Sequence, residues 1–198
     1  MYIHSSIKNY LDELSSEQPI PGGGGTSALA GALGIGLELM VARISLKRAT
    51  LEARSRRSLK QTVKLLEKLR RNAQDAIDLD PKMYAEVMRR SKALKTSGNS
   101  QKAQANAQRA LVDSFRLQAD LALLILMAKE LLAAVDRFAK GSIRNDLIVA
   151  GGLLDGAFCG ALATARINVV YLKPGLERRH CERALARVEQ RHRRIKFE

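Results

Sequence analysis

The chain has few of the residues that build aromatic cores and disulfide frameworks. It contains no Trp, 4 Pro, 2 Cys and 4% aromatic residues in 198 positions, although 46% of its residues are hydrophobic. Such a core must come from Leu, Ile, Val and Ala, which favour closely packed helices. No alternating strand pattern, internal repeat or low-complexity linker is present. We therefore predict an all-α fold, with residues 1–198 forming a single-domain bundle of long antiparallel helices.

Potential metal ligands and thiol nucleophiles are also scarce. Cys159 and Cys181 have neither the spacing of paired metal ligands nor that of a disulfide framework. His4, His180 and His192 are scattered along the chain. We expect no metal site, no cofactor and no activated nucleophile. The N-terminus lacks the basic and apolar regions of a signal peptide, so we expect a cytoplasmic protein.

Long uncharged hydrophobic runs are missing as well. The most apolar stretches, residues 28–42, 121–135 and 147–165, each contain or adjoin a charge. A membrane span usually needs about 20 apolar residues with few or no charges. We predict that these stretches are central helices and that the protein does not enter a membrane.

Positive charge is abundant, with a formal net charge of +14. The cations concentrate in residues 43–71 and 178–196. Such a surface attracts anions, but nucleic acid, an acidic protein and a polyanionic small molecule all fit it. Charge alone does not choose among them.

Hydrophobic periodicity, caps and breakers set the expected helices. Gly141-Ser142 and Pro174-Gly175 separate the later ones, and Asn145 or Asp146 is the expected cap between them. The expected helices cover residues 3–14, 26–46, 51–77, 80–93, 101–138, 145–171 and 176–195.

Four consecutive glycines precede the second expected helix. Gly22, Gly23, Gly24 and Gly25 follow Pro21, and ordering them is costly because each loses more backbone freedom than any other residue. Backbone N–H groups at a helix N-terminus can bind an anionic group, which would justify that cost. We predict a ligand-binding loop; a flexible connection is the alternative. The run lacks the Lys-Ser/Thr ending and the preceding strand of nucleotide-binding loops.

A second polar segment lies at residues 78–84. Asp80 followed by Pro81 is typical of a helix start, and a carboxylate there stays ionised. Tyr84, one turn later, faces the same side, where it stacks on a flat ring or belongs to the core. Asp78 either contacts substrate, orients Asp80 or is a solvated helix end. Asn168 is an amide in an apolar helix and needs hydrogen-bond partners.

Together these motifs resemble the formiminotransferase-cyclodeaminase C-terminal domain family, which includes methenyltetrahydrofolate cyclohydrolases. The glycine run is the most specific part, and the similarity extends from about residue 7 to residue 172. The similar segments are Pro21–Gly25, Gly31-Ala32-Leu33-Gly34, Met40-Val41, Asp78-Leu79-Asp80 with Tyr84 and Val87-Met88, Asp146 to Ala150, and Ile167-Asn168.

The resemblance implies a homodimeric enzyme that hydrolyses the methenyl bridge of tetrahydrofolate or releases ammonia from its formimino derivative. It implies a catalytic role for Asp80, with Asp78 beside it. An ionised carboxylate can offset the positive charge of a methenyl amidinium or accept a proton from an attacking water. The implied substrate-binding residues are Pro21, Gly22, Gly23, Gly24, Gly25, Tyr84 and Asn168.

Some positions depart from the family pattern. Pro81 replaces a small residue, Thr164 replaces an Asn, and Ala93-Leu94-Lys95 stands where the family has Leu-Pro-Lys. Two alternatives to the enzyme follow. One is a non-catalytic basic binding module for nucleic acid or another polyanion, and the other is a dimeric scaffold without activity.

Overall fold

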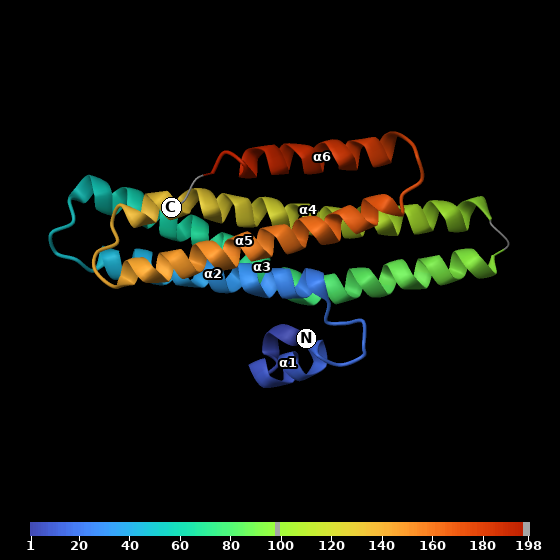
Figure 1. Cartoon of the computed structure of the whole chain (residues 1–198), viewed down its shortest axis with the longest axis horizontal. Coiled ribbons are helices and arrows are strands. Elements are labelled where there is room, and N and C mark those ends of the chain that lie inside the picture. The colour runs from blue at the N-terminus through green and yellow to red at the C-terminus, as the bar shows by residue number, and fades with distance from the viewer. Residues whose placement is uncertain (98–99, 196–198) are drawn as a thin grey trace.

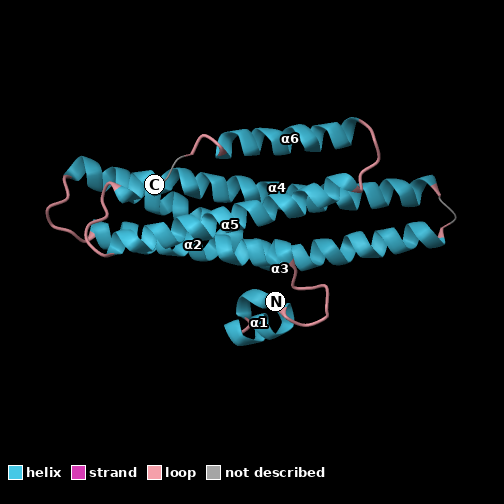
Figure 2. Cartoon of the chain, viewed as in Figure 1, coloured by secondary structure: helices cyan, strands magenta, loops and turns pink. Residues whose placement is uncertain are grey.

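Four long helices run side by side and form the body of the molecule (Figure 1). The computed structural model describes residues 1–97 and 100–195, and within these residues it contains helices and loops but no strand (Figure 2). Each long helix packs against the next, and the last packs against the first. The all-α, antiparallel prediction is confirmed. The four helices are α2 (Gly23–Leu46), α3 (Ala53–Thr96), α4 (Gln101–Asp136) and α5 (Ile143–Val170).

The core is built from aliphatic side chains, as the composition predicts. Among the largest fully buried side chains are Ile35, Leu66, Ile125 and Leu154, one from each long helix. The small residues of α2 allow close helix packing. A Cβ on Gly31 would lie 3.1 Å from Cγ1 of Ile125 in α4. The close neighbours of this part of α2 are therefore other helices.

Three smaller elements decorate the bundle. A 3-10 helix, η1 (Tyr2–His4), contacts α3, and α6 (Leu176–His192) packs on α4 and α5. The first expected helix, residues 3–14, is wrong in its first turn. The α-helix α1 (Ile7–Leu14) starts later because Ser6 caps it, accepting a hydrogen bond from the Asn9 N–H at 3.1 Å.

The two helices expected at residues 51–77 and 80–93 are one continuous helix, α3, with Pro81 inside it. Asp80 is therefore not an N-cap. Pro81 has no N–H to donate to the Ile77 carbonyl, which normally breaks a helix. Here Ile77 and Pro81 are both buried, and packing on both sides of the proline outweighs the lost hydrogen bond. Sequence rules for helix ends do not include that packing.

Other boundaries shift by two or three residues. Helix α2 begins at Gly23 rather than residue 26, so most of the glycine run is its first turn. Helix α5 begins at Ile143 with Ser142 as its N-cap, which corrects the predicted cap at Asn145 or Asp146. The predicted turn at residues 97–100 includes Gly98 and Asn99, which lie outside the described residues.

Helices α2 and α5 are long and apolar enough to cross a membrane by length and composition alone. In the structure 50% and 44% of their most apolar windows are buried inside the bundle. Each packs against the other and against further helices. This arrangement agrees with the prediction of central helices.

The long helices differ in length, and that difference creates a site. Helices α3 and α4 have 44 and 36 residues, whereas α2 and α5 have 24 and 28. The α3–α4 hairpin therefore extends past the start of α2 and the end of α5 (Figure 1). The side chains of α3 and α4 in this extension are not covered by α2 or α5.

Candidate active site

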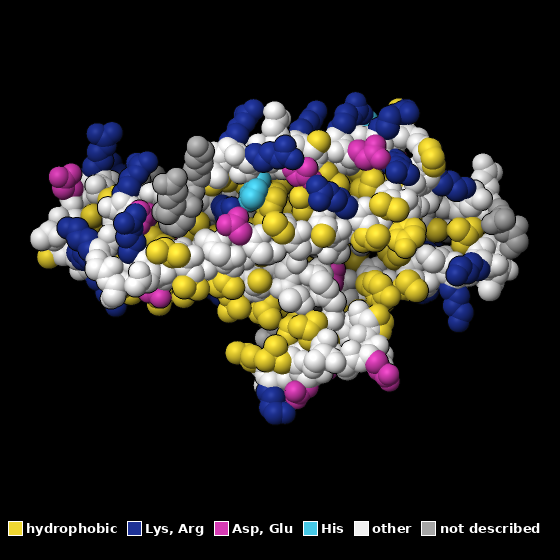
Figure 3. All heavy atoms as spheres, viewed as in Figure 1, with side chains coloured by type: hydrophobic (Ala, Val, Ile, Leu, Met, Phe, Trp, Pro, Cys, Tyr) yellow, Lys and Arg dark blue, Asp and Glu magenta, His cyan; other side chains and the backbone are white. Residues whose placement is uncertain are grey.

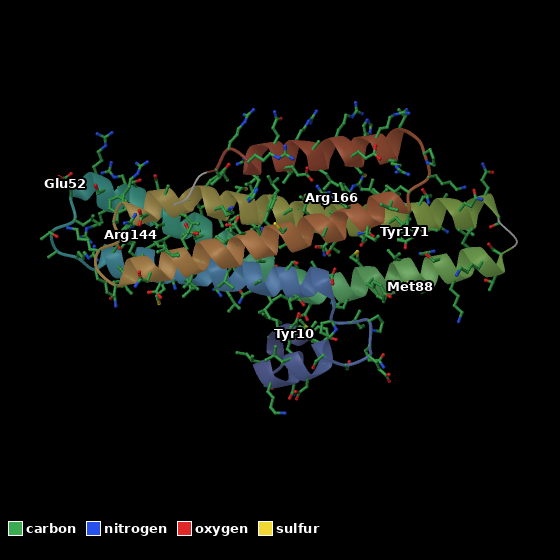
Figure 4. All side chains as sticks on the ribbon, viewed as in Figure 1. Tyr10, Glu52, Met88, Arg144, Arg166 and Tyr171 are labelled. Carbon is green, nitrogen blue, oxygen red and sulfur yellow. The ribbon has the colours of Figure 1, made fainter. Side chains whose placement is uncertain are left out.

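A cavity of about 750 Å³ lies where α2 begins and α5 ends, between α3 and α4. Figure 3 shows a hollow in this region with hydrophobic side chains around it. In Figure 4, Met88 of α3 and Tyr171 after α5 flank the same region. The volume suits a small-molecule ligand.

The inner end of the cavity is formed by Asp80, whose two carboxylate oxygens have fixed donors. The Gly25 N–H of α2 donates to Oδ2 at 2.9 Å. The side-chain Nε2 of Gln118, on α4, donates to Oδ1 at 2.7 Å. Three helices thus hold one carboxyl group in a single orientation.

The close approach of Asp80 requires a glycine at position 24. A Cβ on Gly24 would collide with Asp80 Oδ1 and with Gln118 Nε2. Real Cβ atoms do not approach other atoms so closely, and neither contact atom is at the end of a free surface side chain. The helix that carries the glycine run can therefore meet the carboxyl group only without a side chain at this position.

Burial raises the pKa of Asp80 above its ordinary value, and the hydrogen bonds from Gly25 and Gln118 lower it by less. The predicted helix N-terminus is present, but it is that of α2 rather than of the helix carrying Asp80. Its positive end favours the ionised form. The helix N-terminus therefore stabilises the Asp80 carboxylate as expected, but burial changes the Asp80 pKa more. A carboxyl with a raised pKa is better suited to exchange protons near neutral pH.

The glycine run is divided between the ligand cavity and the carboxyl group. Gly22, Gly23 and Gly24 line the cavity. Gly25 is buried and is not part of the lining, and its N–H binds Asp80. Pro21 is buried and is not part of the cavity lining. Ligand binding by these five residues stays a prediction, and part of the anion-binding capacity serves this chain's own carboxylate.

Tyr84 and Asn168 both line the cavity with Asp80. The Tyr84 side chain is 38% exposed, so the core interpretation is wrong and its ring is accessible. Asn168 is buried, and its Nδ2 donates to the Thr164 carbonyl at 3.0 Å. That bond satisfies one of its donor protons, and its remaining polar capacity is next to the cavity.

Asp78 is not in this cavity. Its Oδ1 accepts a hydrogen bond from the backbone N–H of Tyr2, and it lines a separate hollow of about 380 Å³ under the N-terminal segment. It is buried within α3, so the solvated helix end is wrong. Asp78 attaches η1 to the bundle and does not contact Asp80 or the cavity that Asp80 lines.

Sequence reasoning missed Gln118 and the outer part of the cavity. Gln118 occupies a polar position on the buried stripe Leu111, Phe115, Gln118, Ala122 and Ile125, and that interruption is the signal that could have identified it. Ser114 and Lys95 also line the cavity. Their surroundings depend on the α3–α4 hairpin, which local sequence does not reveal.

Part of the basic surface has a structural role. Arg48 Nη1 donates to the Phe138 carbonyl at 2.6 Å, and Arg56 Nη2 donates to the Arg48 carbonyl at 2.8 Å. These guanidinium groups satisfy carbonyls that follow the C-terminal ends of α4 and α2, where cations are favoured. Other Lys and Arg side chains lie along α6 in Figure 3. Nucleic-acid binding stays a prediction.

Among residues 1–97 and 100–195, no group of three or more His, Cys, Asp or Glu side chains is placed to hold a metal ion.

Comparison with known proteins agrees with this reading of the chain. A family model described as formiminotransferase-cyclodeaminase matches residues 6–190. The methenyltetrahydrofolate cyclohydrolase of Methylorubrum extorquens is 29% identical over 178 residues, which are 89% of this chain and 83% of that protein.

A solved structure also matches over nearly the whole chain. The formiminotetrahydrofolate cyclodeaminase of Thermotoga maritima has a TM-score of 0.83 and covers 99% of this chain and 96% of its own. Its sequence identity is 22%, so this likeness shows the fold.

Proposed function

The chain belongs to the formiminotransferase-cyclodeaminase family, and we propose that this member hydrolyses the methenyl bridge of a tetrahydrofolate derivative. It is a folate one-carbon enzyme of the cyclohydrolase or cyclodeaminase type. The cyclohydrolase relative, at 29% identity, favours hydrolysis over ammonia release. The family match favours either enzyme over a non-catalytic binding module.

One observation carries the proposal: the Asp80 carboxyl is clamped by Gly25 and Gln118 at the inner end of the cavity. The bridge carbon lies between two nitrogens and carries a positive charge, which a nearby carboxylate stabilises. Water adds to that carbon while Asp80 accepts a proton from it. The bond to one nitrogen then breaks as the added hydroxyl loses its proton and becomes the formyl oxygen, and the Asp80 proton passes to that nitrogen. The products are a formyl derivative and one released proton.

The lining of the cavity supports one substrate orientation. Its inner end is polar, with Asp80, Ser114 and Asn168, whereas Val87 and Leu111 line it further out. Lys95, also in the lining, is 15 residues beyond Asp80 on α3, or about 22 Å along the helix axis. We place the fused ring and its one-carbon bridge beside Asp80. The benzoyl group then occupies the apolar section, and the carboxylate tail reaches Lys95.

A spectroscopic assay tests this function. Purified protein should accelerate the loss of methenyltetrahydrofolate absorbance well above the buffer rate, without added metal or cofactor. Formiminotetrahydrofolate serves as the matched alternative substrate, with ammonia as its product. Ammonia release without methenyl hydrolysis would reassign the enzyme to the cyclodeaminase type. No turnover of either substrate would contradict the proposed function.

We further propose that a second copy of the chain covers the outer face of α2 and α5. This face exposes Leu33, Met40 and Ile44 from α2 and Ile148 and Val149 from α5. The space-filling view shows hydrophobic side chains exposed along the α2 side of the molecule (Figure 3). A contiguous apolar surface of this kind is typical of a subunit interface. Sedimentation should give a dimer, and Leu33→Lys should give a folded monomer; a monomeric wild type would contradict the proposal.

The protein is soluble, and we place it in the cytoplasm. Both cysteines are free, and Cys159 is exposed, which suits a reducing compartment. Fractionation of cells that express the tagged chain tests this location, and recovery outside the cytoplasmic fraction would contradict it.

A further inference from the structure

Among residues 1–97 and 100–195, Gln118 is the one side chain that donates a hydrogen bond to Asp80. It is fully buried on α4, and its Nε2 lies 2.7 Å from Asp80 Oδ1. Its other polar atom, Oε1, is buried and has no hydrogen-bond partner in the described part of the chain. A side chain needed only to fill space would not carry an unused acceptor. The amide therefore has a capacity that this arrangement does not use.

The unused acceptor matches the second protonation state of Asp80. Oδ2 faces the Gly25 N–H, which can only donate, so it remains an acceptor in both states. A proton on Oδ1 that points to Gln118 would meet the Nε2 donor. A half-turn of the terminal amide exchanges Nε2 for Oε1, and this torsion is broad and nearly two-fold. Oε1 then accepts the proton of the neutral acid.

We propose that Gln118 is a positioning residue whose amide donates to ionised Asp80 and turns over to accept from protonated Asp80. The inference rests on the proposed proton transfer by Asp80. It assigns to Gln118 the task of holding the carboxyl in one place through both halves of the reaction. The amide itself does not contact substrate in this scheme.

The surroundings of Asp80 contain few other groups that titrate. Tyr10 approaches from α1, with its hydroxyl 3.3 Å from Thr26 Oγ1, and Tyr84 lies one turn away on α3. Helices α2, α4 and α5 present Gly25, Gln118 and Thr164, none of which titrates. A change in Asp80 titration can therefore be traced to Gln118.

The matched variants are Gln118→Met and Gln108→Met. Gln108 is also on α4 and lines the outer cavity, where its Oε1 accepts from the Lys173 N–H at 2.8 Å. Loss of the Gln118 donor removes one of the two bonds that lower the Asp80 pKa. The acid limb of kcat/KM should move to higher pH by about 0.5 to 1 unit. Gln108→Met should leave the acid limb at its wild-type pH. If Gln118→Met instead lowers kcat/KM by the same factor at every pH, Gln118 has only a structural role and the proposal is overturned.

A measurement on the unliganded protein separates this proposal from the proposed function. Carbon NMR follows the titration of the Asp80 carboxyl, whose signal is assigned by its loss in Asp80→Asn. Nitrogen NMR follows the Gln118 side-chain amide in the unmodified protein. The amide signal should change with the same midpoint as the carboxyl and should not titrate in Asp80→Asn. A Gln118 amide that is insensitive to Asp80 would overturn the proposal even in an active enzyme. Coupled titration in a protein without folate turnover would contradict the proposed function alone.

Discussion

Two carboxyl groups, the half-buried Asp80 of α3 and Glu38 of α2, have opposite surroundings. Asp80 meets the first turn of α2, where Gly25 and Gln118 donate to it beside a cavity. Glu38 belongs to the middle of α2 and is completely buried. Within residues 1–97 and 100–195, neither of its carboxylate oxygens has a hydrogen-bond partner. Burial raises the pKa of both groups, and raises that of Glu38 well above its ordinary value.

The difference in hydrogen-bond donors and access distinguishes an acid that is only buried from one that can act on a ligand. Asp80 has fixed donors, so both its ionised form and its geometry are supported, and substrate can reach it. Glu38 has burial alone, which favours the neutral acid and gives no access to a ligand. A raised pKa therefore does not identify a catalytic group unless donors and a cavity accompany it.

The largest expected effect comes from removing the acid function of each group. Asp80→Asn should lower kcat/KM for methenyltetrahydrofolate by about 10²- to 10⁴-fold, because general acid–base catalysis contributes that much. Glu38→Gln is the matched change and should leave turnover within about threefold, because Glu38 does not reach the cavity. Circular dichroism should show a folded bundle in both. Equal losses in the two variants would remove the functional distinction between the carboxyl groups.

The next prediction concerns the backbone against which Asp80 packs. In Gly24→Ala the new methyl group collides with Asp80 and Gln118, and a displacement of about 1 Å can cost about 10²-fold in rate. The overpacking should lower the free energy of unfolding by about 1–3 kcal/mol. In Gly36→Ala, on the same helix, the new Cβ has no atom of this chain within 4 Å besides the helix's own backbone, and it adds a methyl group to the apolar face between Leu33 and Met40.

Gly36→Ala should therefore keep full activity and raise the free energy of unfolding by about 0.5–1 kcal/mol. Steady-state kinetics and urea denaturation of the two variants provide the comparison. If both alanines behave alike, close approach to Asp80 is not the reason for the glycine at position 24.

A smaller effect, on stability alone, is expected at Glu38. Because its folded pKa lies above the unfolded value of 4.5, the folded chain binds the extra proton. Its contribution to stability is then complete below pH 4.5 and is lost as pH rises toward the folded pKa. Relative to wild type, Glu38→Gln should thus become more stable as pH rises through that window.

Glu38→Met should stabilise further, by about 1–3 kcal/mol, because it removes unsatisfied buried oxygens. Denaturation with urea between pH 4.5 and pH 8 measures both variants. A stability difference that does not change with pH would mean that Glu38 is already ionised in the folded protein.

The smallest effect is expected on the far side of the Asp80 site. Tyr10→Phe removes the hydroxyl next to Thr26 and should lower the free energy of unfolding by about 1 kcal/mol. Turnover should change less than about threefold, since the hydroxyl gives no hydrogen bond to Asp80. A loss comparable to that of Asp80→Asn would place Tyr10 in the proton transfer.

The sequence predicts the site better by residue type than by geometry. Asp80, Tyr84 and Asn168, which the family resemblance implied as site residues, line one cavity, and their roles stay predictions. The role of Asp80 as an N-cap was wrong because Pro81 is accommodated inside α3. Gln118 was missed because its partner is 38 positions away in sequence, and no local pattern records that distance.

Composition and periodicity by themselves determined an aliphatic, all-helical bundle, because each amphipathic stripe must bury its apolar side whatever its neighbours are. The glycine run by itself marked the place where another group approaches a backbone closely. The tertiary structure decided that this group is the Asp80 carboxyl, and that Asp78 instead holds the N-terminal segment. It also decided that Asp80 rather than Glu38 has donors and a cavity, since these depend on the relative lengths and packing of four helices.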